Sequence, residues 1–187
     1  MNEVETIQHQ IADLHGKLVA ARRKAPPEPV KDYEFKTPDG APVTLSALFN
    51  GKPELILIHN MGKKCPYCTL WADGLSGVAE HLASRAAFVL TSPDSPQTLK
   101  EFAEGRRWRF RTASIQGTSF AKDMGYESAA GKFQPGVSVF RKEPSGQIVR
   151  TARDTFGPGD PYCSVWHLFN LLPSGADGWQ PKYTYQA

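Results

Sequence analysis

Two cysteines separated by two residues are the part of the sequence best suited to chemistry. They lie in the segment Cys65-Pro66-Tyr67-Cys68, directly after a short apolar run and at the start of a predicted helix. The unpaired N–H groups at a helix N-terminus stabilise an anion, so the pKa of the Cys65 thiol should lie below the free value of about 8.5. Cys68, one turn further on, can attack a mixed disulfide formed at Cys65. We therefore interpret Cys65 as the nucleophile and Cys68 as the resolving thiol of a thiol-exchange reaction.

The residues around the motif fit that interpretation. Pro66 suits the first turn of a helix, because the N–H group that proline lacks would have no helical partner there. Lys63 and Lys64 add positive charge close by, although water screens exposed charges. His59 and Asp73 are candidate proton acceptors. A packed histidine and a solvent-facing aspartate explain the same two residues equally well.

Two other interpretations of the cysteines are open. Cys163 and His167 stand four residues apart in a predicted last helix, so Cys65, Cys68, Cys163 and His167 could form a Cys3His zinc site in a binding or structural module. Alternatively, the cysteines are small core residues without chemistry. Pro66 and the helix start favour a redox turn over a zinc knuckle, so we expect neither a metal nor a cofactor.

Regular elements are predicted on both sides of the motif. The predicted strands cover residues 33–36, 43–45, 54–59, 87–91, 110–114, 137–140 and 148–151, and the predicted helices cover residues 66–84, 95–106 and 164–172. Asp39-Gly40 predicts a two-residue hairpin turn, and Ser46 a cap for a short helix containing Leu48. The alternation of strands and helices predicts an α/β fold, with a central sheet flanked by helices and an added hairpin.

The N-terminal segment has a pattern of its own. Six apolar residues alternate at spacings of three and four, as on a helix with a narrow apolar seam: Val4, Ile7, Ile11, Leu14, Leu18 and Ala21. This N-terminal helix either packs on its own domain or pairs with a second copy in a homodimer. A proline-rich connector over residues 25–29 follows. We therefore divide the chain into residues 1–30, helix and linker, and residues 31–187, the α/β domain.

Five segments together resemble a known family: Met61-Gly62, Cys65-Pro66-Tyr67-Cys68, Trp71-Ala72-Asp73-Gly74, residues 135–140 and residues 168–175. Over residues 33–172 the chain resembles the thioredoxin-fold superfamily, and within it a bacterial thioredoxin-like family classified only as a domain of unknown function (DUF899). The resemblance implies a thioredoxin-like fold and a redox role, but no particular substrate. Asn170 stands where that family is expected to carry Asp.

The resemblance also assigns a role to Pro135. Gln134-Pro135-Gly136 directly precedes the strand predicted to face the cysteines. In thioredoxin-like sites a proline at this place follows a cis peptide bond and presents the backbone of the preceding residue to an incoming peptide or thiol. We therefore expect a cis bond before Pro135 and include Pro135 in the site; an ordinary proline turn is the alternative.

Two better-known relatives fit less well. Cys-Pro-Tyr-Cys is the glutaredoxin spelling, but Gln134-Pro135 replaces the Thr-Val-Pro that such proteins use toward glutathione. The Asp39-Gly40 hairpin resembles peroxiredoxins, but Gly62 stands three residues before Cys65, where their peroxide-polarising threonine belongs. Peroxidase activity therefore ranks below disulfide exchange.

The composition of the chain limits the kinds of partner that we expect. The 187 residues carry 22 basic and 19 acidic side chains, and the net charge of +3 is too small to argue for nucleic acid or an anionic membrane, so we expect neither as a partner. The basic cluster between Lys100 and Arg111 is interpreted as a solvated face. The longest apolar run, residues 55–58, is far too short to cross a membrane. We expect a cytoplasmic protein whose partner is a disulfide-containing protein or a small thiol.

Overall fold

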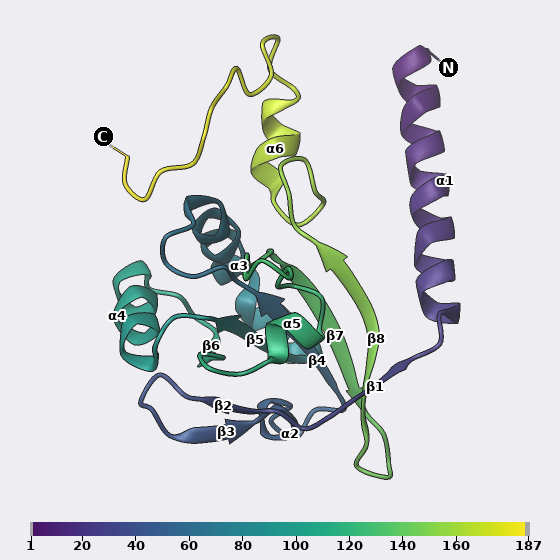
Figure 1. The fold of residues 1–187 in the computed structure, drawn as a ribbon. Coiled ribbons are helices and arrows are strands. Elements are labelled where there is room, and N and C mark those ends of the chain that lie inside the picture. The colour runs from purple at the N-terminus through teal and green to yellow at the C-terminus, as the bar shows by residue number, and fades with distance from the viewer. Residues whose placement is uncertain (1, 186–187) are drawn as a thin grey trace.

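The computed structural model describes residues 2–185. The helices are α1 (Glu3–Lys24), α2 (Leu45–Leu48), α3 (Pro66–Arg85), α4 (Pro96–Arg106), α5 (Phe120–Asp123) and α6 (Ser164–Phe169). The strands are β1 (Glu28–Val30), β2 (Glu34–Lys36), β3 (Pro42–Thr44), β4 (Glu54–His59), β5 (Ala87–Ser92), β6 (Arg111–Ser114), β7 (Gly136–Lys142) and β8 (Ile148–Thr155). Figure 1 shows their arrangement.

One mixed sheet organises the fold. Its eight strands run in the order β1-β8-β7-β4-β5-β6-β2-β3. The three central strands β4, β5 and β6 are parallel, joined through α3 and α4 in the predicted alternation. On the other side of β4 the hairpin β7–β8 pairs antiparallel, with His59 opposite Gly136. The predicted α/β architecture, with flanking helices and an added hairpin, is confirmed.

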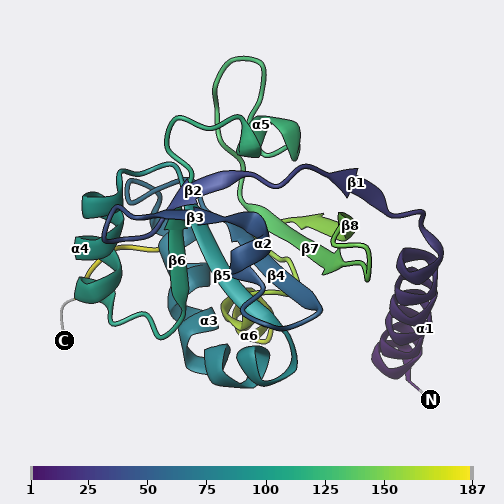
Figure 2. The ribbon, with the colours of Figure 1, turned by 90° about the horizontal axis from the view of Figure 1, so that it is seen from below.

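The two faces of the sheet carry separate hydrophobic clusters. On one face Leu55 and Leu57 of β4 pack with Leu48 of α2 and Phe120 of α5. On the other face Ile58 packs with residues of α3, including Trp71. Figure 2 shows α3 and α6 on one side of the sheet and α5 on the other. Because side chains of a strand alternate between faces, β4 is covered on both sides, as its unbroken apolar centre predicts.

The N-terminal helix forms as predicted, but the connector is more ordered than expected. Asn2 and Glu5 form a capping box, in which each side chain accepts a hydrogen bond from the backbone N–H of the other residue. After the prolines, β1 pairs antiparallel with β8 at the edge of the sheet. An edge position suits Pro29, which has no N–H group to donate. The stiff linker is therefore partly a strand.

Three local details differ from the sequence-based expectations. The hairpin between β2 and β3 has a three-residue loop, since the Thr37 N–H donates to the Ala41 carbonyl and only Gly40 has a positive φ, +84°. Thr44, not Ser46, caps α2. The last helix ends at Phe169, three residues early. No helix within residues 2–185 is both long and apolar enough to span a membrane.

Candidate active site

The loop between β4 and α3 positions the cysteine motif. Gly62, with a φ of +97°, makes the turn, and its N–H donates to Asn60 Oδ1 at 2.7 Å. The next N–H group, of Lys63, donates to Asp94 Oδ2 at 2.7 Å. A Cβ atom added at Gly62 would lie 3.1 Å from the Asp94 carboxylate oxygens. The loop therefore requires glycine both for its backbone angle and for the close approach of Asp94.

Cys65 is the N-cap residue of α3. Its Sγ accepts a hydrogen bond from the Cys68 N–H at 3.1 Å, and its carbonyl accepts one from the Thr69 N–H at 3.1 Å. Pro66 occupies the first helical turn, as predicted. Cys65 is half-buried, whereas Cys68 is only 3% exposed. One sulfur is thus within reach of a substrate, while the other lies behind it.

The environment divides the pair into an acidic and a weakly acidic thiol. A hydrogen bond from the Cys68 side chain, helped by the backbone N–H groups of Cys68 and Tyr67, outweighs burial and lowers the pKa of Cys65 to about 7. The same hydrogen bond, followed by burial, raises the pKa of Cys68 far above its ordinary value. Both side chains are free thiols in the structure. At neutral pH Cys65 is about half ionised, while Cys68 keeps its proton.

Pro135 lies at the end of the sheet from which the motif emerges, but its peptide bond is not cis. No peptide bond within residues 2–185 is cis, so the expectation for the Gln134–Pro135 bond was wrong. Backbone hydrogen bonds from distant segments hold this stretch extended: the Gln134 N–H donates to the Tyr126 carbonyl at 2.8 Å, and the Phe156 N–H donates to the Pro135 carbonyl at 3.0 Å. The next residue, Gly136, pairs with His59 at the end of β4.

His59 is not available as a base for the cysteines. Its ring is 3% exposed, bonds Ser138 Oγ through Nε2 at 2.9 Å and stacks on Tyr126 at 3.7 Å between ring centres. Tyr126 belongs to the cluster on the face of the sheet opposite α3. Burial, and secondarily the charge of Arg150, lowers the pKa of His59 to about 3, so the ring is neutral at physiological pH. His59 is therefore a packed core histidine, which is one of the two interpretations that the sequence left open.

The Asp73 carboxylate is also bound by other side chains and is not free to act as a base. It pairs with the Arg106 guanidinium and accepts a hydrogen bond from Trp108 Nε1 at 2.8 Å. These contacts fasten α3 to α4 and to the segment that follows it. Asp73 therefore serves the packing of two helices rather than the chemistry of the motif.

The proposed zinc set is not assembled. Cys163 is the N-cap residue of α6, not a member of the helix, and it is buried. The His167 ring hydrogen-bonds the Asp160 carbonyl through Nε2 at 2.9 Å. Within the part of the chain that the structure describes, no group of three or more His, Cys, Asp or Glu side chains could hold a metal ion. In this structure the four residues therefore do not form the Cys3His set that the sequence left open.

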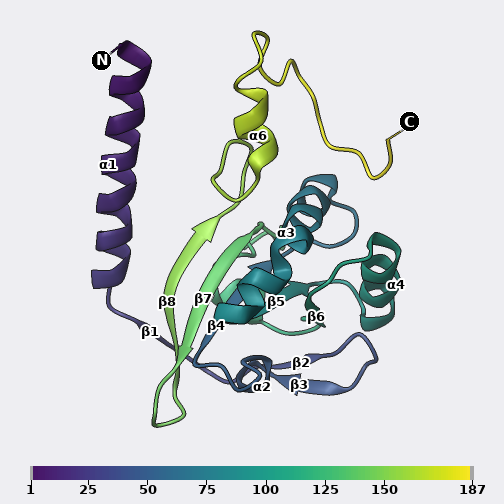
Figure 3. The same cartoon turned by 180° about the vertical axis from the view of Figure 1, so that it is seen from behind.

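The C-terminal tail packs back on the helices of the domain. Trp179 packs edge-on against Trp166 at 5.6 Å, and Arg106 Nη1 donates to the Tyr183 carbonyl at 2.6 Å. Burial, followed by the charge of the Cys65 thiolate, raises the pKa of Tyr183. Figure 3 shows the tail running from α6 toward α4. The aromatic residues of the tail were the sequence signal from which this packing could have been predicted.

The family assignment rests on almost the whole chain. The family model described as bacterial protein of unknown function (DUF899) matches residues 6–186. The chain belongs to this family, as the motif and its surroundings suggested. Among curated protein sequences none matches significantly.

Solved structures with a similar fold include peroxiredoxin-like proteins. Peroxidoxin BcpB from Mycobacterium tuberculosis is 23% identical, with 69% of this chain and 84% of that chain covered and a TM-score of 0.56. A peroxiredoxin-like protein from Aquifex aeolicus is 16% identical, with 69% and 74% covered and a TM-score of 0.52. An uncharacterized conserved protein from Geobacillus kaustophilus is 14% identical, with 84% and 85% covered and a TM-score of 0.55. These similarities establish a thioredoxin-like fold.

Proposed function

We propose that this protein is a thiol–disulfide oxidoreductase in which Cys65 attacks, Cys68 resolves and Pro135 borders the docking site. The observation that carries the proposal is the asymmetry of the pair. The accessible sulfur at the helix N-terminus has a pKa of about 7, and the buried sulfur one turn later stays protonated. Thiol exchange needs this combination, because the thiolate is the nucleophile of the first step and the second thiol reacts only after the mixed disulfide has formed.

The reaction transfers two electrons to the partner. The Cys65 thiolate attacks one sulfur of a partner disulfide, which breaks that bond, forms a mixed disulfide and releases a partner thiolate. The Cys68 thiol gives its proton to that thiolate and attacks the Cys65 sulfur. This step closes the Cys65–Cys68 disulfide and releases the second partner thiolate. The protein is oxidised, the partner is reduced, and the same steps in reverse return the protein to its dithiol form.

The proposal extends to the partner and to the compartment. Pro135 directly precedes Gly136, which pairs with His59 at the end of β4, so Pro135 would border a peptide that docks at this end of the sheet. The partner is then a disulfide-containing protein or a small thiol. A cytoplasmic location completes the proposal, because reducing thiol systems there would regenerate the dithiol.

A trapping experiment tests the proposed roles. The full-length Cys68→Ser variant, mixed with a short peptide that contains one disulfide, should form a covalent adduct at Cys65, identified by mass spectrometry. Wild-type protein should release the peptide as a dithiol. The Cys163→Ser variant is the matched control and should behave as wild type, because Cys163 lies outside the motif.

Two results would contradict the proposal. The first is that Cys68→Ser protein forms no adduct with the peptide. The second is that an adduct forms at Cys163, or equally at all cysteines, since the reaction would then reflect exposure of thiols rather than the activated pair.

The peroxiredoxin-like neighbours favour peroxide reduction as the second candidate. In that reaction the Cys65 thiolate attacks a peroxide oxygen, which gives a sulfenic acid and, after a proton is taken up, water or an alcohol. The Cys68 thiol would then condense with the sulfenic acid, forming the Cys65–Cys68 disulfide and releasing water. Gly62, whose backbone angle and contact with Asp94 exclude a side chain, supplies no hydroxyl to polarise the peroxide. Consumption of hydrogen peroxide in the presence of dithiothreitol separates the two candidates.

A further inference from the structure

The N-terminal helix leaves an apolar stripe uncovered. No residue of α1 is buried. The stripe consists of Ala21 and five larger side chains whose exposed fractions are 63% for Val4, 47% for Ile7, 61% for Ile11, 62% for Leu14 and 46% for Leu18. A helix of 22 residues is about 33 Å long, so this surface is extended. Contiguous apolar surfaces of this kind mark interaction sites.

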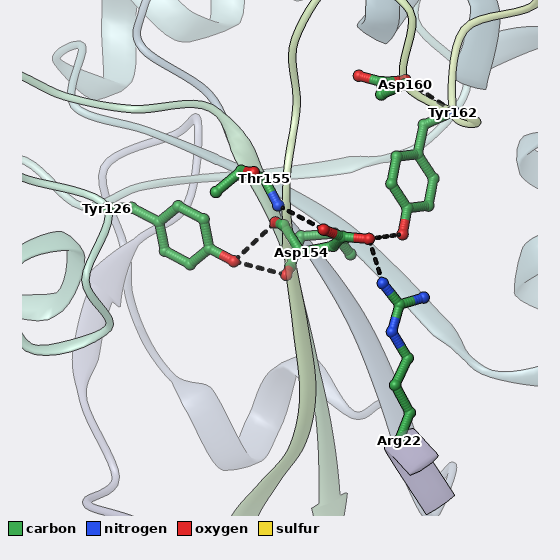
Figure 4. Close-up of polar contacts among 7 residues, drawn as sticks. Arg22, Tyr126, Asp154, Thr155, Asp160 and Tyr162 are labelled. Atoms are coloured by element: carbon green, nitrogen blue, oxygen red, sulfur yellow. Dashed lines mark hydrogen bonds and ion pairs between the residues drawn. The ribbon is translucent and has the colours of Figure 1, made fainter. Parts of the chain in front are cut away.

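Only the last turn of α1 is anchored to the sheet. The Arg22 guanidinium pairs with Asp154 of β8, and the same carboxylate accepts a hydrogen bond from the Tyr162 hydroxyl at 2.7 Å and one from the Thr155 N–H at 3.0 Å (Figure 4). Burial works against ionisation of Asp154, but the hydrogen bonds from Tyr162 and Arg22 outweigh it and lower its pKa. This anchor fixes the direction of the helix. The rest of α1 stands away from the sheet, as Figures 1 and 3 show.

The spacing of the stripe fits a second copy of the same helix running in the opposite direction. In an antiparallel pair, positions a of one helix face positions d of the other. A two-fold axis at the helix centre then forms three kinds of layer: Val4 with Ala21 of the partner subunit, Ile7 with Leu18 of the partner subunit, and Ile11 with Leu14 of the partner subunit. Each layer occurs twice, so every stripe residue is covered. An isologous interface of this type closes as a dimer.

The charges at the two ends select the same orientation. The first turn of α1 carries Glu3 and Glu5, and the last turn carries Arg22, Arg23 and Lys24. An antiparallel pair brings each acidic end beside a basic end, while a parallel pair would place like charges together. The stripe itself contains only apolar residues. The end charges of α1 and the spacing of its apolar stripe therefore both indicate a second, antiparallel copy of α1 as the partner.

An apolar groove continues the surface at the basic end. The groove has a volume of about 250 Å³, and its lining includes Arg22, Ile56, Val139 and Leu82. Arg22 lies four residues after Leu18 of the stripe, on the same side of α1, so an antiparallel partner helix would bring its N-terminal end toward this groove. The surface available to a second copy is thus larger than the helix alone. This matters because three heptads by themselves form a marginal coiled coil.

We propose that α1 pairs antiparallel with α1 of a second copy, so that the protein is a homodimer held by its N-terminal helices. Sedimentation equilibrium of the full chain over the micromolar range should give about twice the 20.6 kDa mass of one chain. The double variant Ile11→Asp, Leu14→Asp should raise the dimer dissociation constant at least tenfold, because it places four carboxylates in the central layers. A monomeric wild type, or a variant that still dimerises as wild type does, would overturn the proposal.

A matched control separates the stripe from the helix as a whole. The variant His9→Asp, Ala20→Asp adds the same charge to the opposite, exposed side of α1 and should dimerise as wild type does. Circular dichroism of both variants checks that the α/β domain stays folded. If the control dissociates as readily as the stripe variant, net charge and not the seam governs association, and the proposal fails.

Cross-linking tests the orientation. In a Cys65→Ser, Cys68→Ser background, chains with Ile7→Cys and chains with Leu18→Cys are oxidised separately and as an equal mixture. The mixture should form a disulfide-linked dimer, while each chain alone should not, because identical positions lie about 16 Å apart along an antiparallel pair. Cross-linking of each chain with itself, with no dimer in the mixture that links an Ile7→Cys chain to a Leu18→Cys chain, would show parallel helices and overturn the antiparallel arrangement.

Discussion

Cys65 and Cys163 occupy the same position in two different helices, yet their environments oppose each other. Each is an N-cap residue with an extended backbone: φ is −101° and ψ 103° at Cys65, and φ is −129° and ψ 108° at Cys163. The pKa of Cys65 is lowered to about 7, whereas burial, followed by the charge of Asp160, raises the pKa of Cys163. A helix N-terminus alone therefore does not activate a thiol.

Two features make the difference. Cys65 Sγ accepts the Cys68 N–H at 3.1 Å and also faces the Cys68 thiol. The Cys163 side chain makes no capping hydrogen bond of that geometry and has no second thiol beside it, and the backbone N–H groups of Val165 and Trp166 do not offset its burial. Cys65 is also half-exposed, whereas Cys163 is 6% exposed. The α3 helix is long and begins at the end of the central strand, while α6 has only six residues. Hydrogen-bond donors and access to water, more than helix position, separate a reactive cysteine from a packed one.

The largest expected difference between the two cysteines is in activity. Replacement of Cys65 by serine should abolish reduction of a peptide disulfide, because no other accessible thiol has a lowered pKa. Replacement of Cys163 by serine should leave the rate within about twofold of wild type, since surface or packing changes away from the site are small. Turnover with dithiothreitol as electron donor measures both. A Cys163→Ser variant as inactive as Cys65→Ser would remove the distinction between the two helices.

Alkylation rates should show the next largest difference. Only the thiolate reacts with iodoacetamide, so the rate at Cys65 should rise with pH through about 7 and level off above it. Cys163, with its raised pKa, should react at least about fiftyfold more slowly than Cys65 at pH 7. Mass spectrometry of peptides from protein alkylated between pH 5 and pH 10, roughly the range over which thiols titrate, gives both profiles. Parallel profiles with the same midpoint would contradict the comparison.

A smaller effect is expected when Cys65 loses its partner. The variant Cys68→Ala removes the hydrogen bond that contributes most to the lowered pKa of Cys65. The pKa of Cys65 should then rise toward that of a free thiol, and its alkylation rate at pH 7 should fall roughly tenfold. The Cys163→Ala variant is the control and should leave the Cys65 profile unchanged. An unchanged Cys65 midpoint in the Cys68→Ala variant would assign the activation to the helix alone.

The smallest expected effect concerns the charge beside Cys163. The variant Asp160→Asn keeps an oxygen that can accept the Gly157 or Tyr162 N–H group but removes the negative charge that raises the pKa of Cys163. Alkylation of Cys163 at alkaline pH should become faster by about threefold or less, because burial, the larger cause, is unchanged. The Cys65 rate serves as the internal reference. A tenfold increase would show that charge and not burial protects Cys163.

The sequence predicted the elements that depend on local pattern. The strand over residues 54–59 has the predicted bounds, and α3 begins at Pro66, because an apolar run and a proline in the first turn are strong local signals. β1 and α5 were missed. β1 has three residues, one of them Pro29, and exists through pairing with β8. α5 has four residues and lacks a side-chain cap.

In the site, the sequence identified the two sulfurs but not their surroundings. Asp94, which holds the Lys63 N–H, comes from a loop after β5, and nothing in its local sequence marks it. The stretch around Pro135 is held by backbone hydrogen bonds to Tyr126 and Phe156, which are contacts between separate segments. The Tyr183 carbonyl is likewise held by Arg106 of α4, a residue far away in the sequence. Long-range contacts of this kind leave no periodic pattern in a single sequence.

Redox titration of the cysteines tests the central claim most directly. The wild-type protein is equilibrated in dithiothreitol buffers of graded potential, the free thiols are alkylated, and the peptides are identified by mass spectrometry. Our account predicts that Cys65 and Cys68 lose and regain their alkylation together, at one midpoint and through a Cys65–Cys68 disulfide, while Cys163 stays a thiol throughout. A pair that never forms this disulfide, or a Cys65 that pairs with Cys163 instead, would contradict it.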